Sequence, residues 1–175
     1  MHNTNEIENI RQELQAVMAF LGAISSGMEQ FLGRPAKGIS FLAGKKLGTK
    51  HSQHARKTVD FLEAIEISKE ILNKNGLLWK FEFWKKKGEA DYIYYNDKGN
   101  KTVNLIFRDC MIRQTLARYG HPQQESLCKM MFGYFSGCME SVLNIESDIN
   151  VIELNVIHCG PNACFKELVL KGGKL

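Results

Sequence analysis

Five cysteines lie in the last two-fifths of this 175-residue chain. They are Cys110, Cys128, Cys138, Cys159 and Cys164. Two of them flank a Gly-Pro-Asn turn in the stretch HCGPNAC, which begins at His158. Sulfur and imidazole at this spacing are compatible with a disulfide loop, a redox pair, a metal site, or a hairpin turn without further chemistry.

A metal site needs a third and a fourth ligand beside the two hairpin cysteines. Cys128 begins a predicted helix that must pack on the same sheet, so a third thiolate can reach the turn. Zn²⁺ takes four nitrogen, sulfur or oxygen ligands, and Glu153 or His158 would complete the set. The spacing differs from the C-x2-C pair of a zinc ribbon, so reduced thiols without a ligand explain the pattern equally well.

The remaining candidates for chemistry are weaker. Thioredoxin-like chemistry requires C-x-x-C at a helix N-terminus, and the hairpin cysteines are farther apart and lie on a turn. Cys138 and Cys110 are expected in the core, and His51 and His54 are expected to face solvent. The sequence contains no phosphate-binding glycine loop, no G-x-S-x-G and no H-E-x-x-H motif, so no reaction centre is predicted.

Composition sets the expected surroundings of these residues. The first residues are polar and acidic, whereas a signal peptide has a basic start followed by an apolar run. No apolar run in the chain approaches the roughly 20 residues of a membrane span. We therefore expect a soluble cytoplasmic protein whose cysteines are thiols or ligands rather than disulfides. The net charge is +4, and the basic run at 85–87 is expected in a solvated turn, so nucleic acid is not an expected partner.

Hydrophobic periodicity predicts the elements that position the candidate residues. Apolar residues at helical spacing predict a first helix over 4–22, a break over 22–38, a second helix from Ile39 and a third over 57–75. Alternation then predicts three antiparallel strands as a meander, a helix over 123–144 and a final hairpin in which Ile152, Leu154 and Val156 face inward. The order ααα-βββ-α-ββ indicates one α+β domain over 1–175, with an antiparallel sheet packed against helices. Glycine pairs one turn apart in two of these helices are expected to allow close backbone contact.

The C-terminal motifs resemble those of the 4-vinyl-reductase domain family, the predicted hydrocarbon-binding domains. That family is similar to the aromatic-sensing domains of bacterial transcriptional activators and, more distantly, to small TRAPP subunits. The shared features are a cysteine that opens a helix, Gly-Tyr-x-x-Gly, a strand glutamate and Gly-x-x-x-Cys. They fall on Cys128, Gly133 with Tyr134 and Gly137, Glu153, and Gly160 with Cys164.

The resemblance implies a zinc site and a dimer. Cys128, Glu153 and Cys164 match ligand positions of the aromatic sensors, whereas Val156 stands where a further cysteine is expected. Cys159 or His158 would have to replace it. The resemblance also implies the fold shared by nitric-oxide-signalling and Golgi-transport proteins, which commonly pair, and the apolar stripe from Ile7 to Leu21 suits such an interface.

We expect a binding module for a small apolar or aromatic ligand, with structural zinc that joins helix to hairpin. The expected ligand-binding residues are Trp79, Phe81, Phe107 and Tyr134. Aromatic residues on strands usually belong to the core, so the resemblance rather than the pattern favours a pocket. Two alternatives remain: a reductase or accessory protein acting on a vinyl-bearing pigment, and an RNA-binding protein whose Trp79, Phe81 or Tyr92 is exposed among basic residues.

Overall fold

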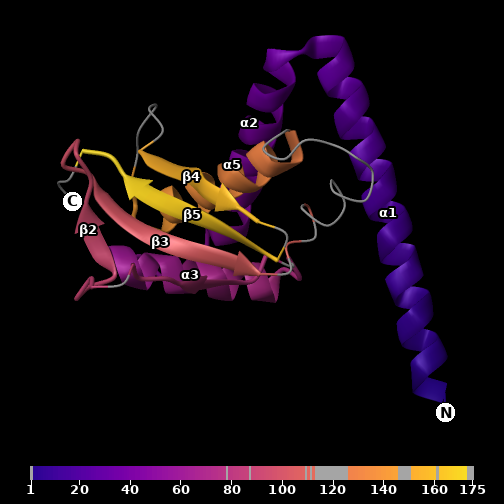
Figure 1. Ribbon diagram of the computed structural model, residues 1–175, viewed down its shortest axis with the longest axis horizontal. Helices are drawn as coiled ribbons and strands as arrows, with labels where there is room; N and C mark the ends of the chain where they lie inside the picture. Colours follow the sequence, from indigo (N-terminus) through magenta and orange to yellow (C-terminus); the bar gives the residue numbers. More distant parts are fainter. Residues whose placement is uncertain are drawn as a thin grey trace.

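The computed structural model has the predicted α+β architecture (Figure 1). It describes residues 2–77, 79–86, 88–108, 110, 112, 126–145, 151–160 and 162–172. The helices are α1 (His2–Leu32), α2 (Arg34–Ser52), α3 (Phe61–Lys74) and α5 (Ser126–Val142). The strands are β1 (Phe81–Phe83), β2 (Ile93–Tyr95), β3 (Lys101–Arg108), β4 (Ile152–Cys159) and β5 (Ala163–Leu170).

The strands form one antiparallel sheet in the order β1-β3-β5-β4, and β2 also pairs with β3. The predicted antiparallel pairing of the second and third strands is confirmed, but the meander is wrong for β1, which pairs with β3 rather than with β2. β1 pairs with residues 105–107 of β3 and β2 with residues 101–103, so the two short strands lie end to end along one neighbour. The segment between β1 and β2 contains Gly88 at a φ of 97° and is too long for a tight hairpin turn.

The last two strands form the predicted hairpin. Ile152 and Leu154 are buried on the face toward the helices, as the alternation predicts. A register shift between Val156 and His158 then moves His158 opposite Phe165 and Cys159 opposite Cys164. Cys159 consequently lies on the face toward the helices and His158 on the opposite face.

Several predicted helix boundaries are wrong. α1 continues through Gly22 to Leu32, and α2 begins at Arg34 rather than near Ile39. Gly33, at a φ of 63°, makes the break alone, and Pro35 fits the first turn of α2 because that position needs no amide donor. The third helix also begins later than the predicted residue 57: α3 starts after Asp60, whose carboxylate accepts a 2.7 Å hydrogen bond from the Glu63 amide.

The expected close contact between helices occurs where α2 crosses α5. A Cβ atom on Gly44 would lie 1.9 Å from the Met130 carbonyl oxygen, and one on Gly133 would lie 1.9 Å from the Phe41 carbonyl oxygen. Gly48 and Gly137 meet backbone in the same way. The two glycine pairs thus allow the two helix backbones to touch.

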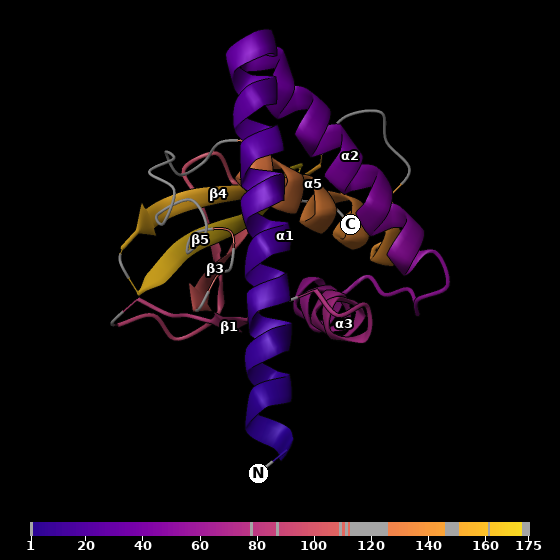
Figure 2. The same cartoon turned by 90° about the vertical axis from the view of Figure 1, so that its right-hand side faces the viewer.

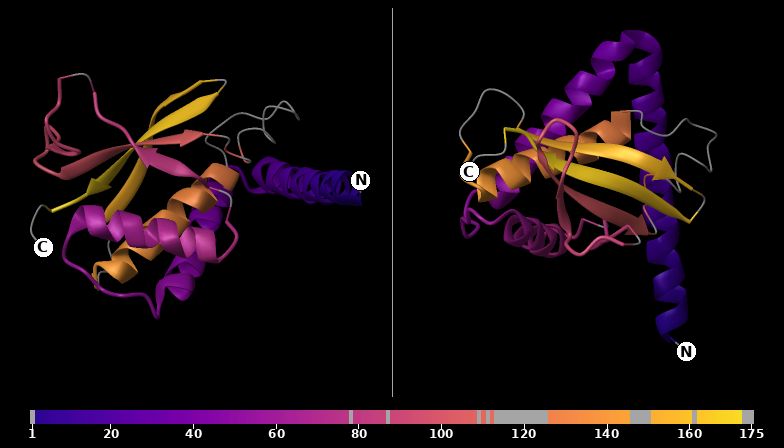
Figure 3. Two further views of the ribbon diagram at one scale, coloured as in Figure 1. Left: turned by 90° about the horizontal axis from the view of Figure 1, so that it is seen from below. Right: turned by 60° about the vertical axis from the view of Figure 1, so that its left-hand side comes forward.

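Helices α3 and α5 lie against one face of the sheet, α2 crosses α5 on the side away from the sheet, and α1 projects away from this body (Figures 2 and 3). The largest fully buried side chains come from both layers and include Tyr134, Phe107, Phe135, Ile65 and Leu72. In the described part of the chain, no helix combines the length and apolar character needed to cross a bilayer.

Candidate functional site

An aromatic cluster lies between the β1–β3 edge of the sheet and α5. The Phe81 ring centroid is 5.3 Å from that of Phe107 and 5.4 Å from that of Phe135. Trp79 approaches α5 as well, with its ring centroid 5.5 Å from that of Tyr134. The structure therefore brings together all four residues predicted to bind a ligand, together with Phe135.

Strand register explains the cluster. Phe81 is paired with Phe107 across β1 and β3, so both side chains lie on the face toward the helices. Phe107 and Tyr134 are fully buried, Phe81 is 3% exposed, and Trp79 is half-buried. Trp79 is thus the member of the four through which solvent reaches the cluster.

A polar pair adjoins Trp79 on the helix side. His51 Nδ1 lies 3.0 Å from the Tyr134 hydroxyl, and the two rings meet edge to face at 5.7 Å. Burial raises the pKa of Tyr134 well above its usual value. At neutral pH the Tyr134 hydroxyl therefore keeps its proton, within hydrogen-bond distance of Nδ1 of His51.

The expectation that His51 faces solvent is wrong. The face of α2 that carries Gly44 and Gly48 packs on α5, and His51 lies one turn beyond Gly48 on that same face. The i, i+4, i+7 spacing of these three residues was the sequence signal for the contact.

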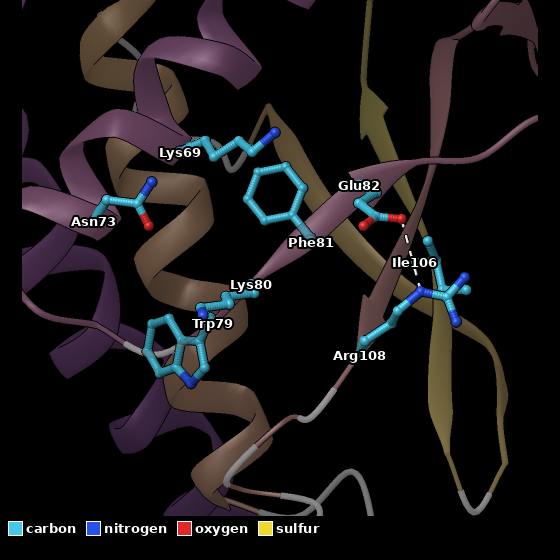
Figure 4. A pocket seen from close by; sticks show the side chains of 8 residues that line it. All are labelled: Lys69, Asn73, Trp79, Lys80, Phe81, Glu82, Ile106 and Arg108. Carbon is cyan, nitrogen blue, oxygen red and sulfur yellow. Dashed lines mark ion pairs between the residues drawn. The ribbon is translucent and has the colours of Figure 1, made fainter.

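A surface pocket of about 310 Å³ adjoins the cluster (Figure 4). Phe81 and Trp79 form its aromatic wall, and Lys69 and Asn73 reach it from α3. Its remaining lining consists of Lys80, Glu82, Ile106 and Arg108. The pocket therefore offers an apolar wall beside polar and charged groups, the combination typical of small-molecule sites.

The charged groups around this pocket are partly paired. The Arg108 guanidinium lies 3.7 Å from the Glu82 carboxylate, and the Lys69 ammonium lies 3.6 Å from the Glu66 carboxylate. The Lys69 ammonium also lies 5.8 Å from the centre of the Phe81 ring. These pairs are solvent-exposed and weak, so a ligand can compete with them for the cations.

The two hairpin cysteines form a disulfide, which corrects the expectation that they are thiols or metal ligands. Cys159 and Cys164 are opposite each other in the β4–β5 register, with their Cα atoms 4.2 Å apart. Cys110, Cys128 and Cys138 are buried thiols outside this bond. Burial raises the pKa of the Cys138 thiol to about 11, in keeping with the core role predicted for it.

The four residues predicted to hold zinc do not fit one ion in this arrangement. The disulfide leaves neither Cys159 nor Cys164 a thiolate to donate. Glu153 lies between inward-facing Ile152 and Leu154, so it points to the opposite face and forms an ion pair with Lys171. His158 stacks on Phe165 on that opposite face.

Cys128 lies on the face of the sheet that is covered by the helices, near the ammonium of Lys166. The Lys166 ammonium lies 4.7 Å from the centre of the Phe132 ring, one turn along α5 from Cys128. Among the residues that the structure describes, no group of three or more His, Cys, Asp or Glu side chains is placed to hold a metal ion. Zinc binding stays a prediction that would require the disulfide to open and Glu153 to move.

No protein-family model matches the chain, and no curated protein matches it. Among the solved structures with a similar fold is the phenol-responsive sensory domain of the transcription activator PoxR, crystallised with phenol. The TM-score is 0.58 at 13% sequence identity, over 87% of this chain and 74% of that one. At this identity the likeness is one of fold.

Proposed function

We propose that this protein is a sensory or regulatory module that binds a small aromatic molecule in the pocket lined by Trp79 and Phe81. The observation that carries the proposal is the aromatic cluster, which continues from the buried core to the wall of a pocket of about 310 Å³. Such a volume is at the lower end for ligand sites and suits a ligand of one or two rings. The phenol in the crystal of the fold neighbour supports the same ligand class.

The lining of the pocket favours a ligand with a phenolic or acidic oxygen. Lys69, Lys80 and Arg108 bring three cationic groups to the pocket, against the single carboxylate of Glu82. Asn73 adds an amide that can donate to the same oxygen. Ring stacking on the half-buried Trp79 then supplies affinity, while the cations select the polar substituent.

A path from the pocket to the helices follows from the contacts of Trp79. A ligand on one side of the indole restricts its rotation, and the other side touches Tyr134 on α5. Tyr134 in turn is hydrogen-bonded to His51 on α2. Occupation of the pocket thereby favours one arrangement of α2 relative to α5. A sensory protein needs such a ligand-dependent shift between two conformations.

We also propose that the chain acts in the cytoplasm, as its composition suggests, and that it forms a homodimer, as the resemblance implies. The RNA-binding alternative is less well supported, because Phe81 is buried and cannot stack on a base. Tyr92 is exposed and has the Lys85 ammonium 4.7 Å from its ring centre, but it stands apart from the Trp79 cluster.

Calorimetric titration with phenol and with benzoate tests the proposal. We expect saturable binding of at least one of the two, and a loss of ten-fold or more in affinity for Trp79→Ala. The matched control is Trp84→Ala, because Trp84 packs against Phe165 on the other face of the sheet and should leave the affinity unchanged. Absence of binding to both probes, or equal losses in the two variants, would refute the site.

A further inference from the structure

An uninterrupted heptad pattern runs along α1. Alternating spacings of four and three residues separate seven of its large apolar residues, which are Ile10, Leu14, Val17, Leu21, Ile24, Met28 and Phe31. A repeat of 3.5 residues keeps one seam facing a partner helix and is the signature of a coiled coil. An ordinary surface helix needs only the looser 3.6-residue stripe.

This seam is uncovered in the chain. Ile10 is 59% exposed, Val17 54% and Phe31 89%. A different face of α1 packs against the rest of the domain. On that face Gly22 and Ser25 are buried, and the Glu29 carboxylate accepts a 2.6 Å hydrogen bond from the Ser126 amide of α5. The N-terminal half of α1 extends well beyond the other elements (Figure 1). An apolar stripe of this length on a monomer marks an interaction surface.

Charge is distributed unevenly along this surface. Glu8 and Glu13 lie in the N-terminal half of α1, whereas no acidic residue occurs between Glu29 and Asp60. That segment carries seven basic residues, from Arg34 through Lys57. Two parallel α1 helices would place the acidic halves side by side, but two antiparallel helices place each acidic half near the basic start of the other copy's α2.

We infer that a second copy of this chain covers the α1 seam, with the two α1 helices antiparallel. In this register Val17 of one copy faces Leu21 of the other, Leu14 faces Ile24, and Ile10 faces Met28. The seam is then closed from Ile10 to Met28, and Glu8 lies about one turn from the second copy's Arg34. This inference rests on the proposed homodimer and is independent of the ligand.

Sedimentation equilibrium of paired variants tests the seam. We expect the unaltered chain to be a dimer at micromolar concentration, and Leu14→Asp/Leu21→Asp to raise the dissociation constant at least 100-fold. The matched control, Gln12→Asp/Ala23→Asp, adds the same charge at exposed positions away from the seam and should remain dimeric. An unaltered chain that is monomeric would overturn both the homodimer and the seam. A dimer that survives the first pair of changes would overturn the seam alone.

Cross-linking with a short bismaleimide tests the orientation. Leu14→Cys mixed with Ile24→Cys should form cross-linked dimers, because these positions face each other in the antiparallel register. Leu14→Cys by itself should not, since its two copies would lie about 15 Å apart along the axis at a rise of 1.5 Å per residue. The native thiols are buried, and the unaltered chain provides the background. Efficient cross-linking of Leu14→Cys to itself would refute the antiparallel arrangement.

Discussion

Among single residues, Lys166 has the most unusual environment, because its charge is buried against aromatic rings. It lies on the face of β5 toward the helices and is 2% exposed, with its ammonium 5.6 Å from the centre of the Phe107 ring. Burial lowers the pKa of Lys166, and the nearby thiols of Cys128 and Cys110 oppose that effect. The favourable contacts with Phe107 and Phe132 do not remove the cost of taking this ammonium out of water.

We predict that Lys166→Met raises the free energy of unfolding by about 1 kcal/mol at pH 7, since an apolar side chain of similar size avoids the desolvation of a buried charge. Chemical denaturation measures this change. The folded chain holds the Lys166 proton less tightly than the unfolded chain, whose lysine pKa is near 10.5. In the pH range between the lowered pKa and that value, the unaltered chain gains stability as pH rises, so the advantage of Met should shrink there.

The control for this prediction is Lys129→Met. Lys129 also places its ammonium over the Phe132 ring, at 5.1 Å, but it is only partly buried. Its replacement should change stability by less than about 0.5 kcal/mol. If Lys166→Met were strongly destabilising, the contacts of the ammonium would have to contribute more to stability than its desolvation costs, which would contradict this account.

The state of the hairpin cysteines can be counted directly. We predict that alkylation under denaturing, non-reducing conditions modifies three cysteines per chain, and that prior reduction raises the number to five, because only Cys159 and Cys164 are disulfide-bonded. Mass spectrometry of the intact chain gives the count. Five modified cysteines before reduction would show that the pair is reduced, and would reopen the question of a metal at this turn.

At the scale of the elements, the contact of α2 with α5 determines where the site residues lie. The glycines at the crossing let the backbones touch, and this contact brings His51 on α2 to Tyr134 on α5. Any side chain added at the crossing would separate the helices and withdraw His51 from the Tyr134 hydroxyl.

We predict that Gly44→Ala lowers the free energy of unfolding by about 3 kcal/mol or more, as expected for overpacking against rigid backbone. A Cβ there would lie 1.9 Å from the Met130 carbonyl oxygen. Gly38→Ala, in the same helix, meets nothing within 4 Å and should be stabilising by up to about 1 kcal/mol. Thermal denaturation of the two variants gives the comparison, and equal effects would contradict the packed crossing.

Much of the arrangement of elements was predictable, because the signals involved are local. Alternation along residues 152–156 predicted the inward face of β4, and the glycine spacing in α2 and α5 predicted close backbone contacts without naming the partner helix. The pairing of β1 with β3 was not predictable from alternation, which shows the face of a strand but not its neighbour. The end of α1 was missed because Gly22 resembles a break, whereas the helix continues through this buried glycine to Leu32.

The candidate site was predictable in part for the same reason. The pattern placed Trp79, Phe81 and Phe107 on strands and Tyr134 on a helix, but their expected role in ligand binding came from the resemblance. His51 was missed because its partner is 83 residues away in sequence, a contact that depends on the α2–α5 crossing. The zinc ligands were predicted from their spacing in the sequence and from the resemblance. The alternation of side chains along β4 instead places Glu153 on the face of the sheet opposite to Cys164.

At the scale of the whole molecule, the helix layer connects the pocket to the exposed seam of α1. The pocket lies at the β1 edge, Trp79 contacts α5, α5 crosses α2, and α2 continues into α1 through Gly33 (Figure 3). A ligand that changes the α2–α5 contact would therefore act on the helix hairpin that carries the proposed dimer surface. This connection suits a module whose output is a change in assembly.

The most direct test of the central claim is a crystal structure of the protein grown with 4-bromophenol, in which the bromine is located by its anomalous scattering. We predict one strong bromine peak in the pocket between α3 and β1, in van der Waals contact with the rings of Trp79 and Phe81, and no such peak in crystals of Trp79→Ala. A pocket without bromine, or a peak confined to the Trp84 face of the sheet, would contradict the proposed aromatic-binding site.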